Sequence, residues 1–136
     1  MPIEDDETIA EILDYETIAV VGCSSTPGKD AHEIPAYMQR HGYRIVPVNP
    51  TVEEVLGERS YESLSAVEAE VDVVDVFRPS EEVAGIVDEA IERGDVKVVW
   101  TQLGIRDDEA AARAEEAGLL VVQNRCVKVE HRRLKH

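Results

Sequence analysis

The residues best suited to chemistry lie in one loop, between an apolar run and a helical pattern. The run Ile18-Ala-Val-Val21 has the β-branched character of a strand buried on both faces, and it stops at Gly22, where the backbone can turn sharply. Residues 24–26 then offer three hydroxyls before a helix that is expected to begin near Asp30. Hydroxyls, backbone N–H groups and the positive end of a helix together favour an anion. The loop is therefore a candidate phosphate-binding turn.

Two known glycine loops differ from this one. The dinucleotide fingerprint has glycines at its first, third and sixth positions, where this sequence has Gly22, Ser24 and Pro27. The mononucleotide P-loop ends in Gly-Lys-Ser/Thr, whereas here Gly28-Lys29 is followed by Asp30. A glycine turn that merely connects a strand to a helix is the alternative interpretation.

The end of the second expected strand bears on the choice of nucleotide. A standard NAD site has an acidic residue there, which holds the ribose hydroxyls. In this sequence the strand at residues 43–48 ends in Asn49-Pro50, and no acid follows until Glu53. A nicotinamide-dinucleotide oxidoreductase is therefore a disfavoured alternative.

Length and charge narrow the classes of protein. A chain of 136 residues is long enough for one domain and too short for two ordinary ones, so residues 1–136 are expected to form a single domain. The 29 acidic residues outnumber the 14 lysines and arginines, and the formal net charge of −15 argues against nucleic acid as a partner. An acidic sequence poor in lysine resembles proteins of salt-loading halophiles, in which salt screens the self-repulsion. An ordinary acidic protein is the alternative.

Targeting and metal signals are missing from the sequence. Residues 2–8 lack the basic start and apolar centre of a signal peptide, and no apolar run approaches membrane-spanning length, so a cytoplasmic location without a membrane partner is expected. Cys23 and Cys126 have no CxxC spacing, and the four histidines, His136 included, show no ligand pattern. We therefore expect neither a structural metal site nor a disulfide.

Strand and helix patterns alternate along the chain. Strands are expected at residues 18–21, 43–48, 71–77, 96–100 and 119–122. Helices are expected at residues 8–13, from 30 to a stop at Gly42, from an N-cap at Ser80 to Gly94, and from Asp107 or Asp108 to Glu116, with a short helix near residues 65–70 in an otherwise irregular segment. The alternation specifies an α/β fold, a Rossmann-like doubly wound parallel sheet of about five strands with helices on both faces.

Ligands of such sheets bind beyond the carboxyl ends of the strands. The candidate lining is therefore residues 22–29, 48–50, 77–78, 100–104 and 124–126. These segments contain Phe77 and Trp100, whose faces can pack an adenine, and Arg78 and Lys29, which can meet phosphate charge. Taken singly, the two aromatic residues can end buried strands and the arginine can pair with a glutamate. Their convergence on one edge favours the functional interpretation.

Five segments at these strand ends resemble the small stand-alone CoA-binding domain proteins, which are themselves similar to the N-terminal domain of the succinyl-CoA synthetase alpha subunit. The segments are residues 22–27, 42–50, 72–78, 99–104 and 124–131, and the resemblance extends over roughly residues 15–134. Five ordered segments are far more specific than a lone glycine motif. The resemblance implies a Rossmann-type domain that binds coenzyme A or an acyl-CoA.

The resemblance also implies contacts with the ligand. The first loop would hold the phosphates, the next two strand ends would surround the adenosine part, and the fourth strand end would follow the pantetheine. Carried over by position, the implied contacts are Gly22, Ser24, Ser25, Thr26 and Lys29 at the phosphates, Val48, Asn49 and Pro50 near the nucleotide, Phe77, Arg78 and Val83 beside the adenine, and Trp100, Gln102 and Gly104 along the pantetheine.

The two cysteines have different expected places. Cys126 follows the fifth strand between Arg125 and Lys128, and is expected near the CoA sulfur, where a thiolate can exchange into a mixed disulfide. A small buried hydrophobe is the alternative for this residue. Cys23, inside the first loop, is expected to approach the phosphates.

The synthetase's catalytic domain, with its phosphorylatable histidine, has no counterpart in this sequence, so no catalytic residue is assigned. The sequence thus predicts a protein that carries or senses CoA or an acyl-CoA. The alternative is the CoA-binding subunit of an acyl-CoA synthetase or transferase whose catalytic groups come from another chain. A partner protein or a homo-oligomer would fit that role.

Overall fold

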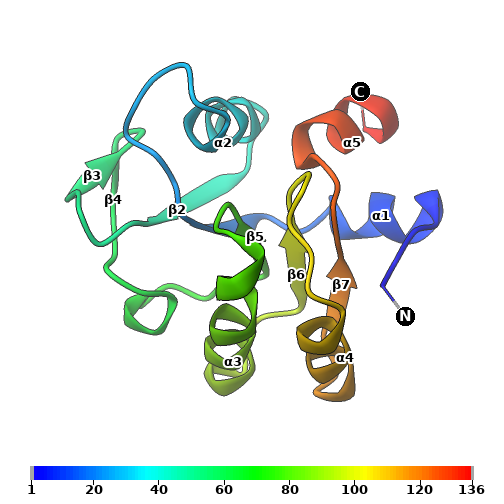
Figure 1. Cartoon of the computed structure of the whole chain (residues 1–136). Coiled ribbons are helices and arrows are strands. Elements are labelled where there is room, and N and C mark those ends of the chain that lie inside the picture. Colours follow the sequence, from blue (N-terminus) through cyan, green and yellow to red (C-terminus); the bar gives the residue numbers. More distant parts are fainter. Residues whose placement is uncertain (1, 136) are drawn as a thin grey trace.

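Five parallel strands form one sheet in the order β2-β1-β5-β6-β7 (Figure 1). The computed structural model describes residues 2–135, so His136 lies outside the described residues. Within them the strands of this sheet are β1 (Thr17–Val21), β2 (Arg44–Val48), β5 (Val73–Val76), β6 (Val98–Thr101) and β7 (Leu120–Val122), and the α-helices are α1 (Asp6–Ile12), α2 (Asp30–Arg40), α3 (Val83–Arg93), α4 (Asp108–Glu116) and α5 (Val127–Leu134). The strand order reverses between β1 and β5. The predicted Rossmann-like, doubly wound α/β class is confirmed.

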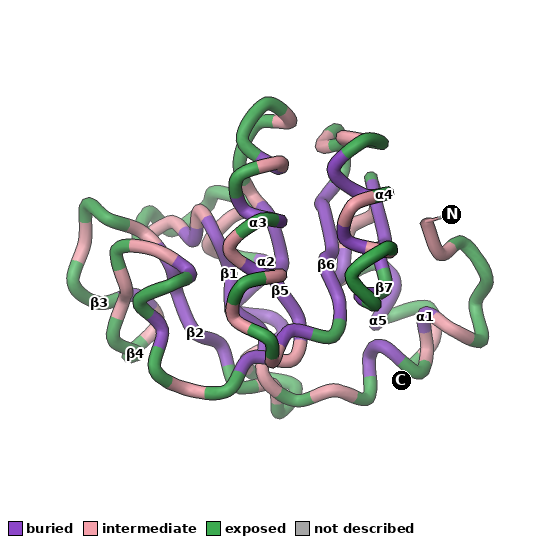
Figure 2. The backbone as a smooth tube through the Cα atoms, turned by 90° about the horizontal axis from the view of Figure 1, so that it is seen from below, coloured by how far each residue is buried: buried purple, intermediate pink, exposed green. Residues whose placement is uncertain are grey.

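Helices cover both faces of the sheet. α1, α2 and α5 lie on one face, and α3 and α4 lie on the other (Figure 1). Because side chains alternate along a strand, Ile18 and Val20 of β1 point into the core under the first group, and Ala19 and Val21 point into the core under the second. The strands are buried, while the outer surfaces of the helices are exposed (Figure 2). A parallel sheet buried on both faces explains why the strand sequences are continuously apolar.

Capping residues mark the start of one helix and the end of another where the sequence predicts them. Asp107 is the N-cap of α4, and its carboxylate accepts a hydrogen bond from the Ala110 N–H at 3.0 Å. Gly94 ends α3 with a φ of 81°, a left-handed conformation that favours glycine. Across the described residues, none of the helices has the length and apolar character needed to cross a membrane.

The start of α3 differs from the prediction. Ser80 is not its N-cap, because Ser80–Glu82 form a single 3-10 turn, η2, and α3 begins at Val83. The Ser80 hydroxyl instead accepts a hydrogen bond from the Arg106 N–H at 2.9 Å. A good capping residue is thus used to tie the segment after β5 to the segment after β6.

Residues 51–66 contain a small hairpin that the sequence patterns do not indicate. Its strands are β3 (Glu54–Val55) and β4 (Glu58–Arg59), and the turn at Leu56-Gly57 has two successive positive φ angles, 56° and 77°. Strands of two residues are too short to display alternation. The helix predicted near residues 65–70 is wrong, since the chain forms only a 3-10 turn there, η1 (Leu64–Ala66).

The last helix, α5, is also missing from the sequence prediction. The helix is amphipathic, but it has only eight residues, and two of its three buried residues, Glu130 and His131, are polar. Glu130 accepts hydrogen bonds from Arg125 at 3.2 Å and Arg133 at 2.7 Å, and the His131 Nδ1 lies 2.8 Å from the Tyr37 hydroxyl of α2. Tertiary pairing, rather than apolar periodicity, holds this helix on the sheet.

The halophile hypothesis can be tested by salt. We expect the melting temperature, followed by circular dichroism, to rise from low to molar KCl, because salt screens the repulsion of a surface with a net charge of −15. In the matched variant Glu7→Gln with Glu11→Gln, two exposed carboxylates one turn apart on α1 are removed. That variant should be more stable at low salt and less dependent on KCl. A melting temperature that is flat or falls with KCl would contradict the hypothesis.

Candidate functional site

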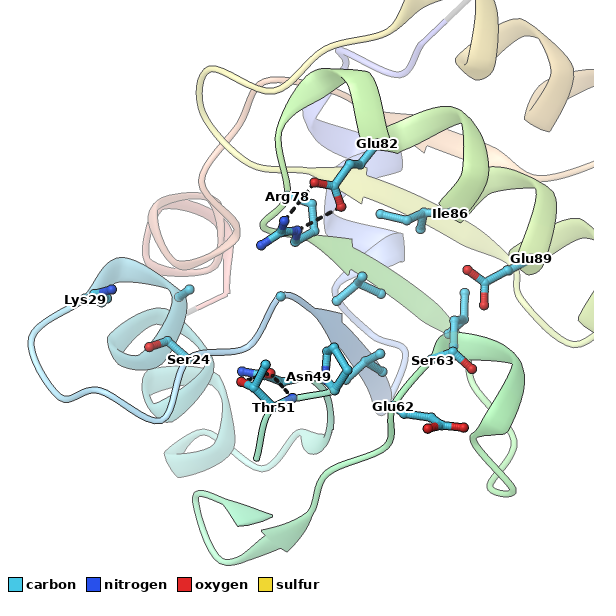
Figure 3. Close-up of a pocket in the computed structure, with 16 residues that line it drawn as sticks. Ser24, Lys29, Asn49, Thr51, Glu62, Ser63, Arg78, Glu82, Ile86 and Glu89 are labelled. Carbon is cyan, nitrogen blue, oxygen red and sulfur yellow. Dashed lines mark hydrogen bonds and ion pairs between the residues drawn. The ribbon is translucent and has the colours of Figure 1, made fainter. Parts of the chain in front are cut away.

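A cleft of about 590 Å³ opens at the carboxyl ends of β1, β2 and β5 (Figure 3). Its walls come from the loop after β1, the end of β2, the segment that leads into η1, and one side of α3. This is where the strand order reverses, the position at which open α/β sheets bind their ligands. The sequence-predicted residues that line it are Gly22, Ser24, Lys29, Val48, Asn49, Pro50 and Arg78.

Gly22 brings two of these walls together. A Cβ atom at this position would lie 2.8 Å from both the Phe77 carbonyl oxygen and the Arg78 Cδ, and the backbone has a φ of 91°. The Gly22 N–H also donates to the Val48 carbonyl at 2.9 Å. The ends of β1, β2 and β5 therefore meet at a residue that must lack a side chain.

The loop after β1 is held by its own polar groups. The Ser24 hydroxyl accepts a hydrogen bond from the Thr26 N–H at 3.0 Å. In the first turn of α2, Glu33 accepts one from the Gly28 N–H at 3.1 Å, and this bond is the main cause that lowers the pKa of its carboxyl. A carboxylate of the protein thus already lies beside the start of α2. Ser25 and Thr26 are exposed and lie outside the cleft lining.

Asn49 ties the end of β2 to the first loop. Its side-chain N–H donates to the Cys23 carbonyl at 2.8 Å, and its side-chain oxygen accepts from the N–H and the hydroxyl of Thr51 at 2.9 and 2.8 Å. Both ends of the amide are therefore engaged within the protein. At the position where an NAD site has a ribose-binding acid, this chain has a neutral group that fixes two loops.

Arg78 faces the cleft and is paired with Glu82 (Figure 3). The guanidinium donates from Nε at 3.0 Å and from Nη2 at 2.7 Å to the two carboxylate oxygens. The hydrogen bonds lower the pKa of the Glu82 carboxyl and raise that of Arg78. The side chains are 46 and 45 % exposed, so the pair lies at the boundary between cleft and solvent. The pairing with a glutamate, an alternative for Arg78 in the sequence, is thus present at the site itself.

One stripe of α3 and η2 completes the lining without having been singled out in the sequence. Glu82, Ile86 and Glu89 follow each other at helical spacing and face the cleft (Figure 3). Glu89 accepts hydrogen bonds from the N–H and hydroxyl of Ser65 at 3.0 and 2.9 Å. This stripe could have been predicted from the sequence, because residues three or four positions apart on a helix that follows a strand end face the same side of that helix.

The predicted aromatic lining is not formed. Trp100 is wholly buried, at 0 % exposure, under α1, α2 and α5, and its indole N–H donates to a main-chain carbonyl after β7 at 2.8 Å. Phe77 packs against the same core, and Val83 is buried in the core on the other face of the sheet. Cys126 lies outside the cleft lining, partly buried against the core. These four residues sit behind the site rather than in it.

Gln102 and Gly104, the other predicted pantetheine contacts, form ties between loops. The Gln102 amide donates to Asp75 at 2.6 Å and accepts from the Val127 N–H at 3.3 Å, which links β5 to the start of α5. The Gly104 N–H donates to the Asn124 side chain at 2.7 Å. Neither residue lines the cleft.

Asp75 is a buried acid in the middle of the sheet. Its side chain is 2 % exposed, and burial raises its pKa to about 7 despite the hydrogen bond from Gln102. Cys23 lies nearby at 0 % exposure, and burial, together with the charge of Asp75, raises the pKa of its thiol to about 12. The prediction that Cys23 approaches the phosphates is therefore wrong, because this thiol belongs to the core under α2.

The strand reversal, the glycine contact and the cleft define a Rossmann-like α/β domain with a cleft at its topological switch point. The chain belongs to the CoA binding domain family, which it matches over residues 16–132. The resemblance seen in the strand-end segments is thereby confirmed. Membership of this family supports coenzyme A binding in general terms.

The relatives include whole proteins of this size and parts of larger ligases. The chain is 41 % identical over 124 residues to Uncharacterized protein YneT of Bacillus subtilis, covering 90 % of this chain and 91 % of that one. A solved structure described as a hypothetical protein from Pyrococcus horikoshii OT3 matches with a TM-score of 0.94 at 43 % identity, covering 100 % and 97 %. Subunit alpha of ADP-forming acetate–CoA ligase II from Pyrococcus furiosus is 29 % identical over 119 residues, which are 84 % of this chain and 26 % of that subunit.

The burial of Asp75 should make stability depend on pH. Between the ordinary pKa of 3.8 and the folded value of about 7, the folded protein keeps a proton that the unfolded chain has released. The free energy of unfolding therefore falls as the pH rises through this window. Asp75→Asn carries no charge, so its melting temperature should exceed that of the wild type by several degrees at pH 8 and approach it at pH 5.

Asp72→Asn is the matched control for that measurement. Against the desolvation of partial burial, Lys97 and the Thr17 N–H hold the pKa of Asp72 below its usual range. This variant should be destabilised by an amount that stays constant from pH 5 to 8. If the difference between Asp75→Asn and wild type were equally constant, the pH-dependent cost of ionising Asp75 in the core would be refuted.

Proposed function

We propose that this protein binds coenzyme A, or an acyl-CoA, in the cleft at the carboxyl ends of β1, β2 and β5. The observation that carries the proposal is the position of this cleft at the switch point of a CoA binding domain family member. Its volume of about 590 Å³ is in the ordinary range for small-molecule sites, about 300–1,000 Å³. The function proposed is carrying or sensing the ligand.

The phosphates of the ligand would lie between the first loop and Arg78. Among the described residues that line the cleft, Lys29 and Arg78 carry the positive charge, and they come from opposite walls (Figure 3). Ser24 adds a hydroxyl to the lining, and the start of α2 adds the positive end of a helix dipole. Charge-assisted hydrogen bonds to phosphate are the strongest polar contacts available here.

The adenine would lie against the apolar part of the cleft. Val48 and Pro50 at the end of β2, Leu64 of η1 and Ile86 of α3 line that part. This replaces the earlier expectation of an aromatic lining, since Phe77 and Trp100 pack into the core. An aliphatic slot of this kind buries an adenine face through the hydrophobic effect rather than through ring stacking.

A second candidate is a CoA-holding subunit of an acyl-CoA ligase whose catalytic groups come from another chain. The similarity to subunit alpha of an acetate–CoA ligase favours it. Binding of CoA in the same cleft is common to both candidates. A nicotinamide dinucleotide is favoured by neither, because the Asn49 amide is engaged by Cys23 and Thr51 and supplies no acid for the ribose.

Calorimetric titration tests the proposed ligand. Ligand-free protein should bind CoA in a saturable manner, and NAD should bind at least about tenfold more weakly, a difference of about 1.4 kcal/mol. The reason is that Lys29 and Arg78 can meet the phosphates of either ligand, whereas the end of β2 offers the NAD ribose no acid. Equal or tighter binding of NAD, or no binding of CoA, would refute the proposal.

Arg78→Ala tests the phosphate contact. Loss of one charge-assisted contact should weaken CoA binding by about 1–3 kcal/mol, measured in the same titration. The melting temperature should change little, since Arg78 is half exposed and lies outside the core. Arg106→Ala is the control: it removes the same charge from an exposed arginine that does not line the cleft. If both variants bind CoA as the wild type does, Arg78 is only a surface ion-pair partner.

A further inference from the structure

The carboxylate of Glu82 occupies one of the two edges of the Arg78 guanidinium that can bind a phosphate through two hydrogen bonds, the edge formed by Nε and Nη2. Its two oxygens take the Nε and Nη2 hydrogens in a fork-like arrangement, at 3.0 and 2.7 Å. A phosphate accepts from a guanidinium in the same bidentate geometry. A ligand phosphate and Glu82 are therefore alternative partners of this edge of the guanidinium, and of the single positive charge that it carries.

The neighbouring acids of the cleft are arranged differently. Glu89 is held by the N–H and hydroxyl of Ser65, so its carboxylate is committed to the segment of η1. Glu62 lines the cleft on the wall opposite α3 (Figure 3). Among these three acids, Glu82 is the one whose carboxylate contacts the arginine of the site.

Glu82 also has a second favourable position when it leaves Arg78. It is the residue before α3, whose eleven residues run from Val83 to Arg93, and no side-chain cap is present at that end. A carboxylate near a helix N-terminus is stabilised by the helix dipole. Since the side chain is 45 % exposed, it can turn toward solvent and this helix end without disturbing the core.

We propose that Glu82 is a built-in competitor for the Nε edge and the charge of Arg78, and that a ligand phosphate displaces Glu82 from this edge on binding. This inference rests on the proposed function of the cleft and deepens it. The exchange makes the site selective for phosphate-bearing ligands, because a neutral ligand offers Arg78 nothing in return for the carboxylate. It also lowers the affinity for CoA below the value that the same arginine would give if it were unpaired.

The test compares two variants with the same change of charge. Glu82→Gln removes the competing carboxylate, while Glu81→Gln removes an exposed carboxylate from the adjacent residue of η2, which makes no ion pair with any residue from 2 to 135. In calorimetric titrations with CoA, Glu82→Gln should lower the Kd by about two- to tenfold relative to wild type, the range set by exposed ion pairs and added repulsion. Glu81→Gln should give a clearly smaller gain.

A third measurement separates competition from plain repulsion. In the Arg78→Ala background there is no guanidinium to release, so the gain from Glu82→Gln should shrink. If Glu82 acted only by repelling the ligand, the gain would stay the same or grow, because Arg78 would no longer screen the carboxylate. Melting temperatures of all variants should confirm that each remains folded.

The outcomes distinguish the inference from the function on which it rests. Absence of CoA binding by the wild type refutes the proposed function and this inference with it. Binding by the wild type, with equal Kd values for Glu82→Gln and Glu81→Gln, refutes the competition alone. The same holds if Glu82→Gln binds more weakly, since Glu82 would then be positioning Arg78 for the ligand, or if its gain persists undiminished in the Arg78→Ala background.

Discussion

The contact between Gly22 and the end of β5 is the constraint on which the site depends. A side chain at residue 22 would meet the Phe77 carbonyl and Arg78 at 2.8 Å, so the segments that follow β1 and β5 approach this closely only because residue 22 is glycine. The same approach places the first loop, Asn49 and Arg78 around one cleft. The reversal of strand order provides the opening, and the glycine fixes how near its walls come. For the shape of the cleft, the position of this loop therefore matters more than the polar groups that the loop carries.

Much of this arrangement could be predicted from the sequence, for identifiable reasons. Strands buried on both faces are continuously apolar, and Gly94 and Asp107 end or begin helices by local signals. The loop at Gly22 to Lys29 and the segment at Val48 to Pro50 could be assigned to the cleft because carboxyl ends of parallel strands share one edge. What could not be predicted is how far a residue at that edge sits below the surface. Trp100 is a strand residue at the right edge but points into the core.

The predicted site residues that lie outside the cleft show why position in the sequence is not enough to assign a ligand contact. Gln102 comes directly after β6, as a ligand contact would, yet its amide joins Asp75 to the start of α5. That helix has only eight residues, and two of its three buried residues are polar, so no long apolar stripe marks it or its anchor in the sequence. A buried polar group requires a partner, and here the partner of a sheet acid is the residue expected to touch the ligand. The same edge of the sheet therefore lines the cleft and also holds α5 in place.

A protein with a net charge of −15 that binds a polyanion must separate two scales of electrostatics. Over distances beyond the Debye length, about 10 Å at 0.1 M salt and about 3 Å at 1 M, the surface repels such a ligand only when salt is low. Within the cleft, Lys29 and Arg78 would meet the proposed ligand at hydrogen-bonding distance, where screening is weak. In the proposed exchange, the ion pair with Glu82 would set this short-range attraction, since it neutralises Arg78 until a ligand phosphate replaces the carboxylate. High salt therefore removes the long-range penalty and leaves the short-range recognition, which makes an acidic surface compatible with an anion site.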